Sequence, residues 1–219
     1  MPEHSTSQTS EYAPAQDCNL CPRLVEFRQR NRETWPDWHN APVQSFGDMD
    51  ARLLIVGLAP GLRGANRTGR PFTGDYAGDL LYQTLSKFRF ATGTYDKRPD
   101  DGLQLHDCRI ANGVRCLPPE NKPIGSEVNN CRRFLSAEIT AMDNLKVILA
   151  LGGVAHNTIL ATLGERRAAY KFSHCAFHHL IDGRILANSY HCSRYNTNTG
   201  RLTEQMFEDV FEGICERLK

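Results

Sequence analysis

The sequence lacks a long apolar run, a secretory leader and any large excess of charge. None of its 219 residues lies in an apolar stretch near the roughly 18 residues that a membrane-spanning helix needs. The first residues contain no apolar segment of a signal peptide. Basic side chains number 26 and acidic ones 25, a net charge of +1. This balance excludes an evenly basic surface or an acidic tail but allows a local basic groove. We expect a cytoplasmic protein without a membrane segment.

Three chemical fingerprints are also absent. The sequence contains no G-x-x-x-x-G-K-[ST] phosphate loop, no G-x-G-x-x-G dinucleotide turn and no H-E-x-x-H zinc pair. These absences argue against a P-loop nucleotide hydrolase, a dinucleotide-dependent enzyme and a zinc protease of the common type.

Length and composition predict a single domain. Hydrophobic residues make up 40% and charged residues 23% of the chain, which is ordinary for a globular protein. Residues 1–16 are polar and rich in Ser, Thr and Pro, and we interpret them as a disordered tail. Residues 17–219 are long enough to bury about 70% of their unfolded surface without disulfide bonds.

Four short apolar runs predict buried strands, at residues 52–58, 108–114, 146–151 and 184–190. Helical patterns occupy residues 75–88, 126–142, 154–163 and 204–218. The strands lack polar alternation, which is typical of a sheet covered on both faces. We therefore predict an α/β fold, a three-layer α/β/α sandwich with a central four-stranded parallel sheet. Its ligand site should lie at the carboxyl ends of the strands.

The eight cysteines include a candidate metal-binding set. Cys18 and Cys21 form a C-x-x-C motif, and Cys116 and Cys131 are separated by fourteen residues. Four thiolates in two groups can hold a tetrahedral zinc ion or a [4Fe–4S] cluster, and spacing alone does not choose between them. The alternative is a set of unconnected buried thiols, since free cysteine is among the most buried residue types.

Residues 57–75 form a loop with five glycines and three arginines that ends at Asp75. Glycines let the backbone approach a ligand closely, and arginines contact phosphates. Phe72 is placed to stack on a flat base, or else belongs to the core. Asp75 precedes a helical pattern, so it is either an N-cap or a functional carboxylate, and the two roles are compatible. The composition favours an anion or nucleotide site.

The loop after the fourth predicted strand contains His191. This position is at the ligand edge of a parallel sheet, although a single histidine is more often structural. Ser193, Arg194, Asn196 and Arg201 follow it and suit contacts to a phosphodiester backbone.

Together these segments resemble the uracil-DNA glycosylase superfamily, specifically its family 5, the iron–sulfur type. Residues 57–60, 66–70 and 72–75 resemble the first motif of that family, and residues 191–196 match its H-x-S-x-x-N motif. The segment 112–123 resembles the part that joins a cluster cysteine to the base pocket. The resemblance runs from Cys18 to near the C-terminus.

The resemblance implies a monofunctional glycosylase that acts on DNA. Such an enzyme flips uracil out of duplex DNA and hydrolyses the N-glycosidic bond, leaving an abasic site. We expect it to accept other deaminated bases, hypoxanthine and xanthine, and to be a monomer. The competing hypothesis is a nucleic-acid-binding module with a metal cluster and no catalysis. The resemblance also implies a [4Fe–4S] cluster, on Cys18, Cys21, Cys116 and Cys131.

It assigns roles to individual residues as well. The implied catalytic residues are Asp75, His191 and Asn121. The implied base-binding residues are Phe72, Asn112, Gly57, Leu58, Ala59 and Gly61. The implied DNA-binding residues are Arg63, Arg67, Arg70, Ser193, Arg194, Tyr195, Asn196 and Arg201. Two positions depart from better-known relatives: Ala59 replaces a polar residue that positions water, and Cys192 replaces a proline. Asp75 is the expected substitute for the missing polar group.

Overall fold

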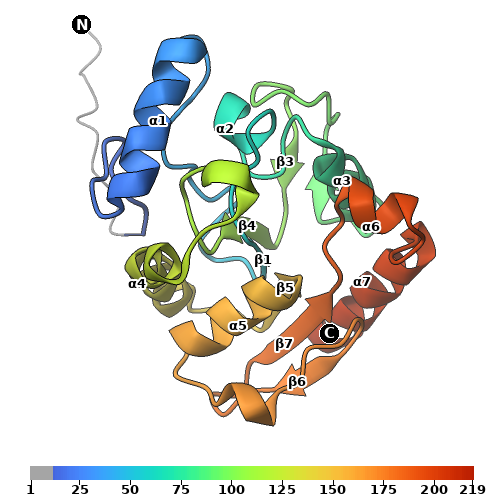
Figure 1. Cartoon of the computed structure of the whole chain (residues 1–219). Helices are drawn as coiled ribbons and strands as arrows, with labels where there is room; N and C mark the ends of the chain where they lie inside the picture. Colours follow the sequence, from blue (N-terminus) through green and yellow to red (C-terminus); the bar gives the residue numbers. More distant parts are fainter. Residues whose placement is uncertain (1–11) are drawn as a thin grey trace, which may run out of the picture.

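A computed structural model describes residues 12–219, and within them the central sheet has five strands in the order β4-β1-β5-β7-β6 (Figure 1). The parallel members are β1 (Leu53–Gly57), β4 (Cys108–Asn112), β5 (Val147–Leu151) and β7 (Ile185–Ser189). The four-stranded parallel prediction is confirmed for these strands. The fifth strand, β6 (Phe177–His179), pairs antiparallel with β7 and was not predicted. Its three residues include two histidines, so it has no apolar run to reveal it.

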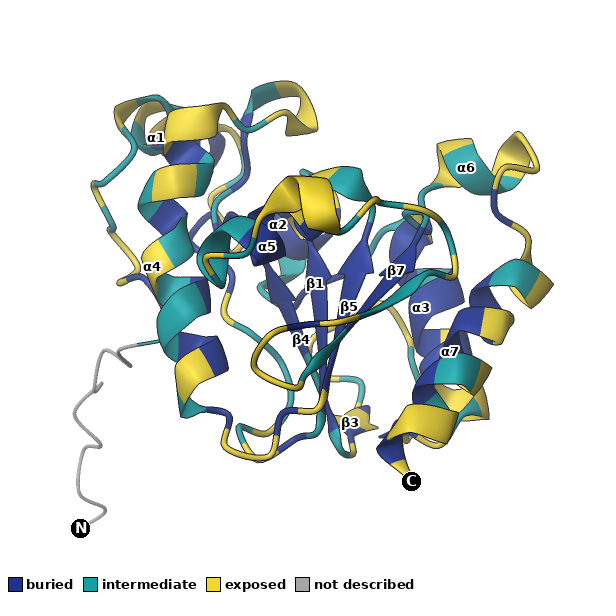
Figure 2. Cartoon of the chain, turned by 90° about the horizontal axis from the view of Figure 1, so that it is seen from below, coloured by how far each residue is buried: buried dark blue, intermediate teal, exposed yellow. Residues whose placement is uncertain are grey.

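Helices cover both faces of the sheet (Figures 1 and 2). One face packs against α3 (Tyr76–Lys87) and α7 (Glu204–Leu218), and the other against α4 (Gly125–Ala141) and α5 (Gly153–Thr162). In β1, Leu53 and Ile55 face the first layer while Leu54 and Val56 face the second. Because both sets are fully buried, the strand reads as a continuous apolar run.

The remaining elements are short, except for the first helix. They are α1 (Pro22–Thr34), α2 (Ala65–Thr68), β2 (Ala91–Thr92), β3 (Gln104–Leu105), α6 (Arg194–Asn198) and two 3-10 turns, at Pro119–Asn121 and Arg167–Ala169. Residues 1–11 of the predicted disordered tail lie outside the described residues. Within residues 12–219, no helix combines the length and the apolar character needed to cross a membrane.

Arg70 belongs to the interior and not to a DNA-facing surface. It is 5% exposed, and its guanidinium donates to both Asp101 carboxylate oxygens at 2.8 and 2.7 Å. The cation also lies over the rings of Phe46, Tyr82 and Tyr95. The expectation that Arg70 contacts DNA is therefore wrong, because every part of its head group is used inside the fold.

Replacing Arg70 by alanine should destabilise the protein strongly. The Asp101 side chain is fully buried, so the variant would bury an unpaired carboxylate at a cost of about 3–5 kcal/mol. Urea denaturation measures this loss. The control is Arg67→Ala, since Arg67 is exposed and makes no ion pair within the described part of the chain. That control should change the free energy of unfolding by no more than about 0.5 kcal/mol. Equal losses of unfolding free energy in the two variants would contradict the placement of Arg70 in the interior.

Candidate active site

A cavity of about 640 Å³ opens at the carboxyl ends of β1 and β4. Residues 58–65 form one wall, and residues 72–77 contribute to another. Most of the residues expected at the site line this cavity: Leu58, Ala59, Gly61, Arg63, Phe72, Asp75, Asn112, Asn121, His191, Ser193 and Arg194. The sheet edge thus brings together segments that are more than a hundred residues apart in the sequence.

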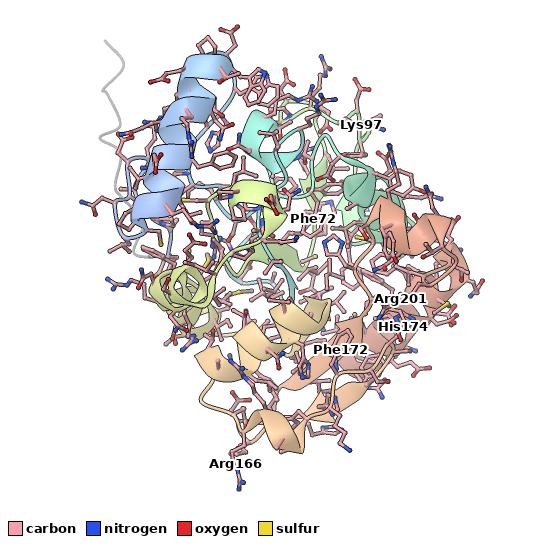
Figure 3. All side chains as sticks on the ribbon, in the orientation of Figure 1. Phe72, Lys97, Arg166, Phe172, His174 and Arg201 are labelled. Atoms are coloured by element: carbon pink, nitrogen blue, oxygen red, sulfur yellow. The ribbon has the colours of Figure 1, made fainter. Side chains whose placement is uncertain are left out.

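Phe72 and Asn112 meet above Gly57. A Cβ atom at Gly57 would lie 2.6 Å from the Phe72 ring and 2.5 Å from Asn112 Oδ1, so only glycine fits there. Phe72 is 6% exposed and has a left-handed backbone with φ of 52°, a conformation that is uncommon for residues other than glycine. Its ring stacks with the His191 imidazole at 5.9 Å between centroids. Figure 3 shows Phe72 near the centre of this face of the molecule.

Asn112 lines the cavity and carries a buried hydrogen-bond acceptor without a partner among residues 12–219. The residue ends β4 and is 3% exposed, and its Oδ1 atom has no hydrogen-bond partner in the described structure. A buried polar atom left without a partner costs about 1–3 kcal/mol. A ligand that supplies an N–H group would remove this cost.

Asp75 is both an N-cap and a cavity residue. Its Oδ1 accepts the Gly78 N–H at 3.2 Å at the start of α3. Its other carboxylate oxygen faces the glycine loop, where a Cβ atom at Gly61 would come within 3.1 Å of it. Burial raises the pKa of Asp75, and the backbone N–H groups of Gly78 and Ala77 oppose that shift. Asp75 therefore caps α3 and also lines the cavity, so its geometry is compatible with both roles suggested by the sequence.

His191 lies just beyond β7, and the following turn holds its backbone. Asn196 Nδ2 donates to the His191 carbonyl oxygen at 2.8 Å, and Ser193 Oγ accepts the Asn196 N–H at 3.4 Å as the cap of α6. Burial lowers the pKa of His191, which favours the neutral imidazole at neutral pH. Asn196 and Ser193, both expected to contact DNA, thus also shape this turn.

The other expected DNA contacts occupy different positions. Arg63 and Arg194 are exposed at the rim of the cavity. Tyr195 is 72% exposed on α6, and Arg67 is exposed on α2 but does not line the cavity. Arg201 is exposed, and its guanidinium lies 4.6 Å from the centre of the Tyr190 ring.

Asn121 reaches the cavity from a strained turn. Glu120 and Asn121 have φ values of 55° and 57°, in the left-handed region that asparagine tolerates better than most residues. The turn begins after Pro118, whose carbonyl oxygen accepts the Asn121 N–H at 3.1 Å. The exposed Asn121 therefore lines the cavity from a segment that follows β4 and not from the glycine loop.

The four candidate cysteines line a second, smaller cavity, between α1, α4 and the segment after β4. Nitrogen donors approach three of the sulfurs: Arg28 approaches Cys116 at 3.8 Å, Asn130 approaches Cys21 at 3.7 Å, and the Arg115 N–H approaches Cys131 at 3.3 Å. Among residues 12–219, no group of three or more His, Cys, Asp or Glu side chains is placed to hold a metal ion.

The chemistry around these cysteines suits a thiolate-bound cluster. N–H groups directed at sulfur, together with burial, are the features by which proteins tune such clusters. Burial raises the pKa of the Cys116 thiol to about 12 and that of Cys131 to about 11, so without a metal both stay protonated at neutral pH. Sequence reasoning missed Arg28 and Asn130, because a polar residue on a helix gives no sign that it points at a sulfur.

The comparison with known families agrees with this geometry. The model of the uracil-DNA glycosylase superfamily matches residues 44–215. The chain belongs to this superfamily. A type-5 uracil-DNA glycosylase of Thermus thermophilus is 44% identical over 88% of this chain and 90% of the relative. One of Pyrobaculum aerophilum is 39% identical over 89% and 86%. A type-4 enzyme of Thermotoga maritima is 37% identical over only 52% and 51%. Within the uracil-DNA glycosylase superfamily, the similarity is thus more extensive to type 5.

Asp75→Asn should stabilise this member of the superfamily at neutral pH. Asparagine caps a helix as well as aspartate does, and the change removes a carboxylate whose pKa is raised by burial. A raised folded-state pKa means that the ionised form costs stability above that pKa. The Tm should rise by about 2–4 °C for each kcal/mol of that cost.

The increase in Tm caused by Asp75→Asn should shrink as the pH falls toward 3.8, the ordinary pKa of an aspartate carboxyl group. Calorimetry over a pH series measures it, and Asp143→Asn is the control because Asp143 is exposed. A lower Tm for Asp75→Asn at pH 7 would contradict the description of this carboxylate.

Proposed function

We propose that this chain is a uracil-DNA glycosylase that flips uracil out of duplex DNA and hydrolyses its N-glycosidic bond. One observation carries the proposal. A carboxylate (Asp75), an imidazole (His191) and an aromatic ring (Phe72) line a single cavity at the carboxyl edge of the sheet. These groups provide what the reaction needs: a surface for the flat base, a donor for the leaving group and a negative charge for the sugar.

Asn112 and Phe72 suit recognition of the base. Uracil carries an N–H donor between its two carbonyl groups, and the unsatisfied Asn112 Oδ1 is an acceptor that would pair with it. The Phe72 ring offers a stacking surface, which contributes about 1–3 kcal/mol per base in nucleic-acid complexes. Phe72 would thus set the plane of the base, and Asn112 would recognise the edge that carries the N–H group.

His191 and Asp75 divide the chemistry. As the bond between the sugar C1′ and the base N1 breaks, its electron pair goes to uracil and positive charge develops on the sugar. A neutral His191 donates a hydrogen bond to the uracil carbonyl oxygen, an interaction of the kind that contributes roughly 3 kcal/mol. The ionised Asp75 stabilises the sugar cation and orients the water whose oxygen bonds to C1′. The proton that the water loses passes to the carboxylate.

An assay on uracil-containing duplexes tests the proposed function. Wild-type protein should produce abasic sites, which alkali converts into strand breaks. Asp75→Asn should slow single-turnover cleavage about 10²–10⁴-fold, since the variant loses both the charge and the proton acceptor. Because Asp75→Asn is expected to be more stable than the wild type, its loss of activity would reflect the chemical step and not unfolding. Absence of product from the wild-type protein would reject the glycosylase and favour a DNA-binding module.

We also propose that the enzyme accepts hypoxanthine and xanthine. Gly61 forms the wall of the cavity beside Asp75. By the resemblance, superfamily members that act only on uracil carry a bulky tyrosine at this position. A smaller wall leaves space for a purine in a cavity of about 640 Å³.

Gly61→Tyr should therefore narrow the substrate range. We expect the rate on xanthine, relative to that on uracil, to fall at least roughly tenfold, as for steric exclusion from a pocket. Gly61→Ala is the matched control, because its Cβ atom makes the same contact with Asp75 but adds only a methyl group to the wall. If both variants keep the wild-type ratio of the xanthine rate to the uracil rate, Gly61 does not control which bases the enzyme accepts.

We propose that Cys18, Cys21, Cys116 and Cys131 hold a [4Fe–4S] cluster. When bound, the cluster would cross-link α1 to the segment after β4 and to α4 as a structural element. Arg28 supports this, because its cation lies beside Cys116 and its other nitrogen donates to the Cys18 carbonyl oxygen at 2.9 Å.

Cys116→Ser should lose the cluster, whereas Cys175→Ser, at an exposed cysteine outside this cavity, should keep it. Iron and acid-labile sulfide per chain, measured on protein purified without oxygen, report the result. Stoichiometric zinc in place of iron, or unchanged iron in Cys116→Ser, would contradict the proposal.

A further inference from the structure

Tyr190, the residue before His191, is held by side chains that the proposed reaction does not use. Its ring stacks on the His174 imidazole, with centroids 5.0 Å apart and planes 19° apart. The Arg201 guanidinium lies 4.6 Å from the same centroid, and the Phe172 ring packs at 6.2 Å. Figure 3 shows Phe172, His174 and Arg201 gathered on this side of the molecule. Two segments, residues 172–174 and the loop that carries Arg201, thus converge on one residue next to a candidate catalytic group.

His174 also holds the backbone at this point. The Tyr190 N–H donates to His174 Nδ1 at 3.1 Å, and His174 Nε2 lies 3.1 Å from the Met206 carbonyl oxygen. Since a carbonyl only accepts, Nε2 carries the proton and Nδ1 is the acceptor. Both ring nitrogens are therefore used, which selects one neutral tautomer.

We propose that neutral His174 is a positioning residue for His191, acting through the Tyr190 backbone and ring. β7 ends at Ser189, so Tyr190 is the first residue beyond the sheet and has no strand partner for its N–H. His174 supplies that partner, and Asn196 holds the next carbonyl oxygen. These two anchors fix the backbone on either side of the His191 Cα atom, from which the imidazole projects. The inference rests on the proposed function for its catalytic consequence.

Burial, and not the neighbouring carboxylate, favours the neutral form of His174. Burial lowers the pKa of His174, while the Asp209 carboxylate of α7 and the Met206 carbonyl oppose that shift. Arg201 places a fixed positive charge over the Tyr190 ring that His174 also contacts. Protonation at Nδ1 would remove the acceptor for the Tyr190 N–H, so the anchor operates only above the pKa of His174.

Two substitutions separate the contacts of His174. Asparagine reaches the position of Nδ1 and keeps an acceptor for the Tyr190 N–H, whereas glutamine reaches the position of Nε2 and keeps the donor to Met206. We expect His174→Asn to retain single-turnover activity within about threefold. We expect His174→Gln to lose about 10²-fold, as for a small misplacement of a catalytic group, with DNA affinity unchanged. The reverse order, or equal rates in both variants, would overturn the proposal.

A second readout does not depend on catalysis. Nitrogen-15 NMR of the imidazoles should show His174 protonated at Nε2 alone at neutral pH, and the His191 signals should shift or broaden in His174→Gln but not in His174→Asn. His191 signals that match the wild type in both variants would overturn the positioning role. If the wild-type protein lacks glycosylase activity, the proposed function fails, while this spectrum still decides the inference.

Discussion

The absence of side chains at Gly57 and Gly64 is the constraint on which the cavity depends. At Gly57, Phe72 and Asn112 occupy the space that a Cβ atom would need, and at Gly64 the Asp75 carboxyl carbon would lie 2.8 Å from one. The glycine loop therefore packs its bare backbone against three side chains that line the cavity. Any residue larger than glycine at Gly57 would push apart the Phe72 ring and the Asn112 amide.

The α/β frame supplies the rest of the site. β1 and β4 end side by side, so the loop after Gly57 and the side chain of Asn112 reach the same edge. On the other side of that edge, the small core cluster of Leu24, Val114 and Cys131 packs against Ala59. The cysteine cavity and the active-site wall therefore share one packed unit, so a change at the cysteines is expected to be felt at the glycine loop.

The sequence predicts the frame well, because four strands buried on both faces leave clear apolar runs. It also brings Asp75, His191 and Phe72 to one place through the rule for parallel sheets. It fails for Arg70 and β6. A buried arginine paired with Asp101 looks in sequence like its exposed neighbour Arg67, and a three-residue strand with two histidines has no apolar signature. Contacts between distant residues, such as His174 with Tyr190, have no local pattern at all.

The most direct test of the account is a crystal structure of the Asp75→Asn variant bound to a duplex that contains one uracil. This variant keeps the helix cap but loses the charge, so it should trap the substrate. The account predicts a flipped uracil stacked on Phe72, with its N–H on Asn112 Oδ1 and a carbonyl oxygen about 2.7–3.1 Å from His191. A uracil that stays in the helix, or that is held away from Phe72 and His191, would contradict it.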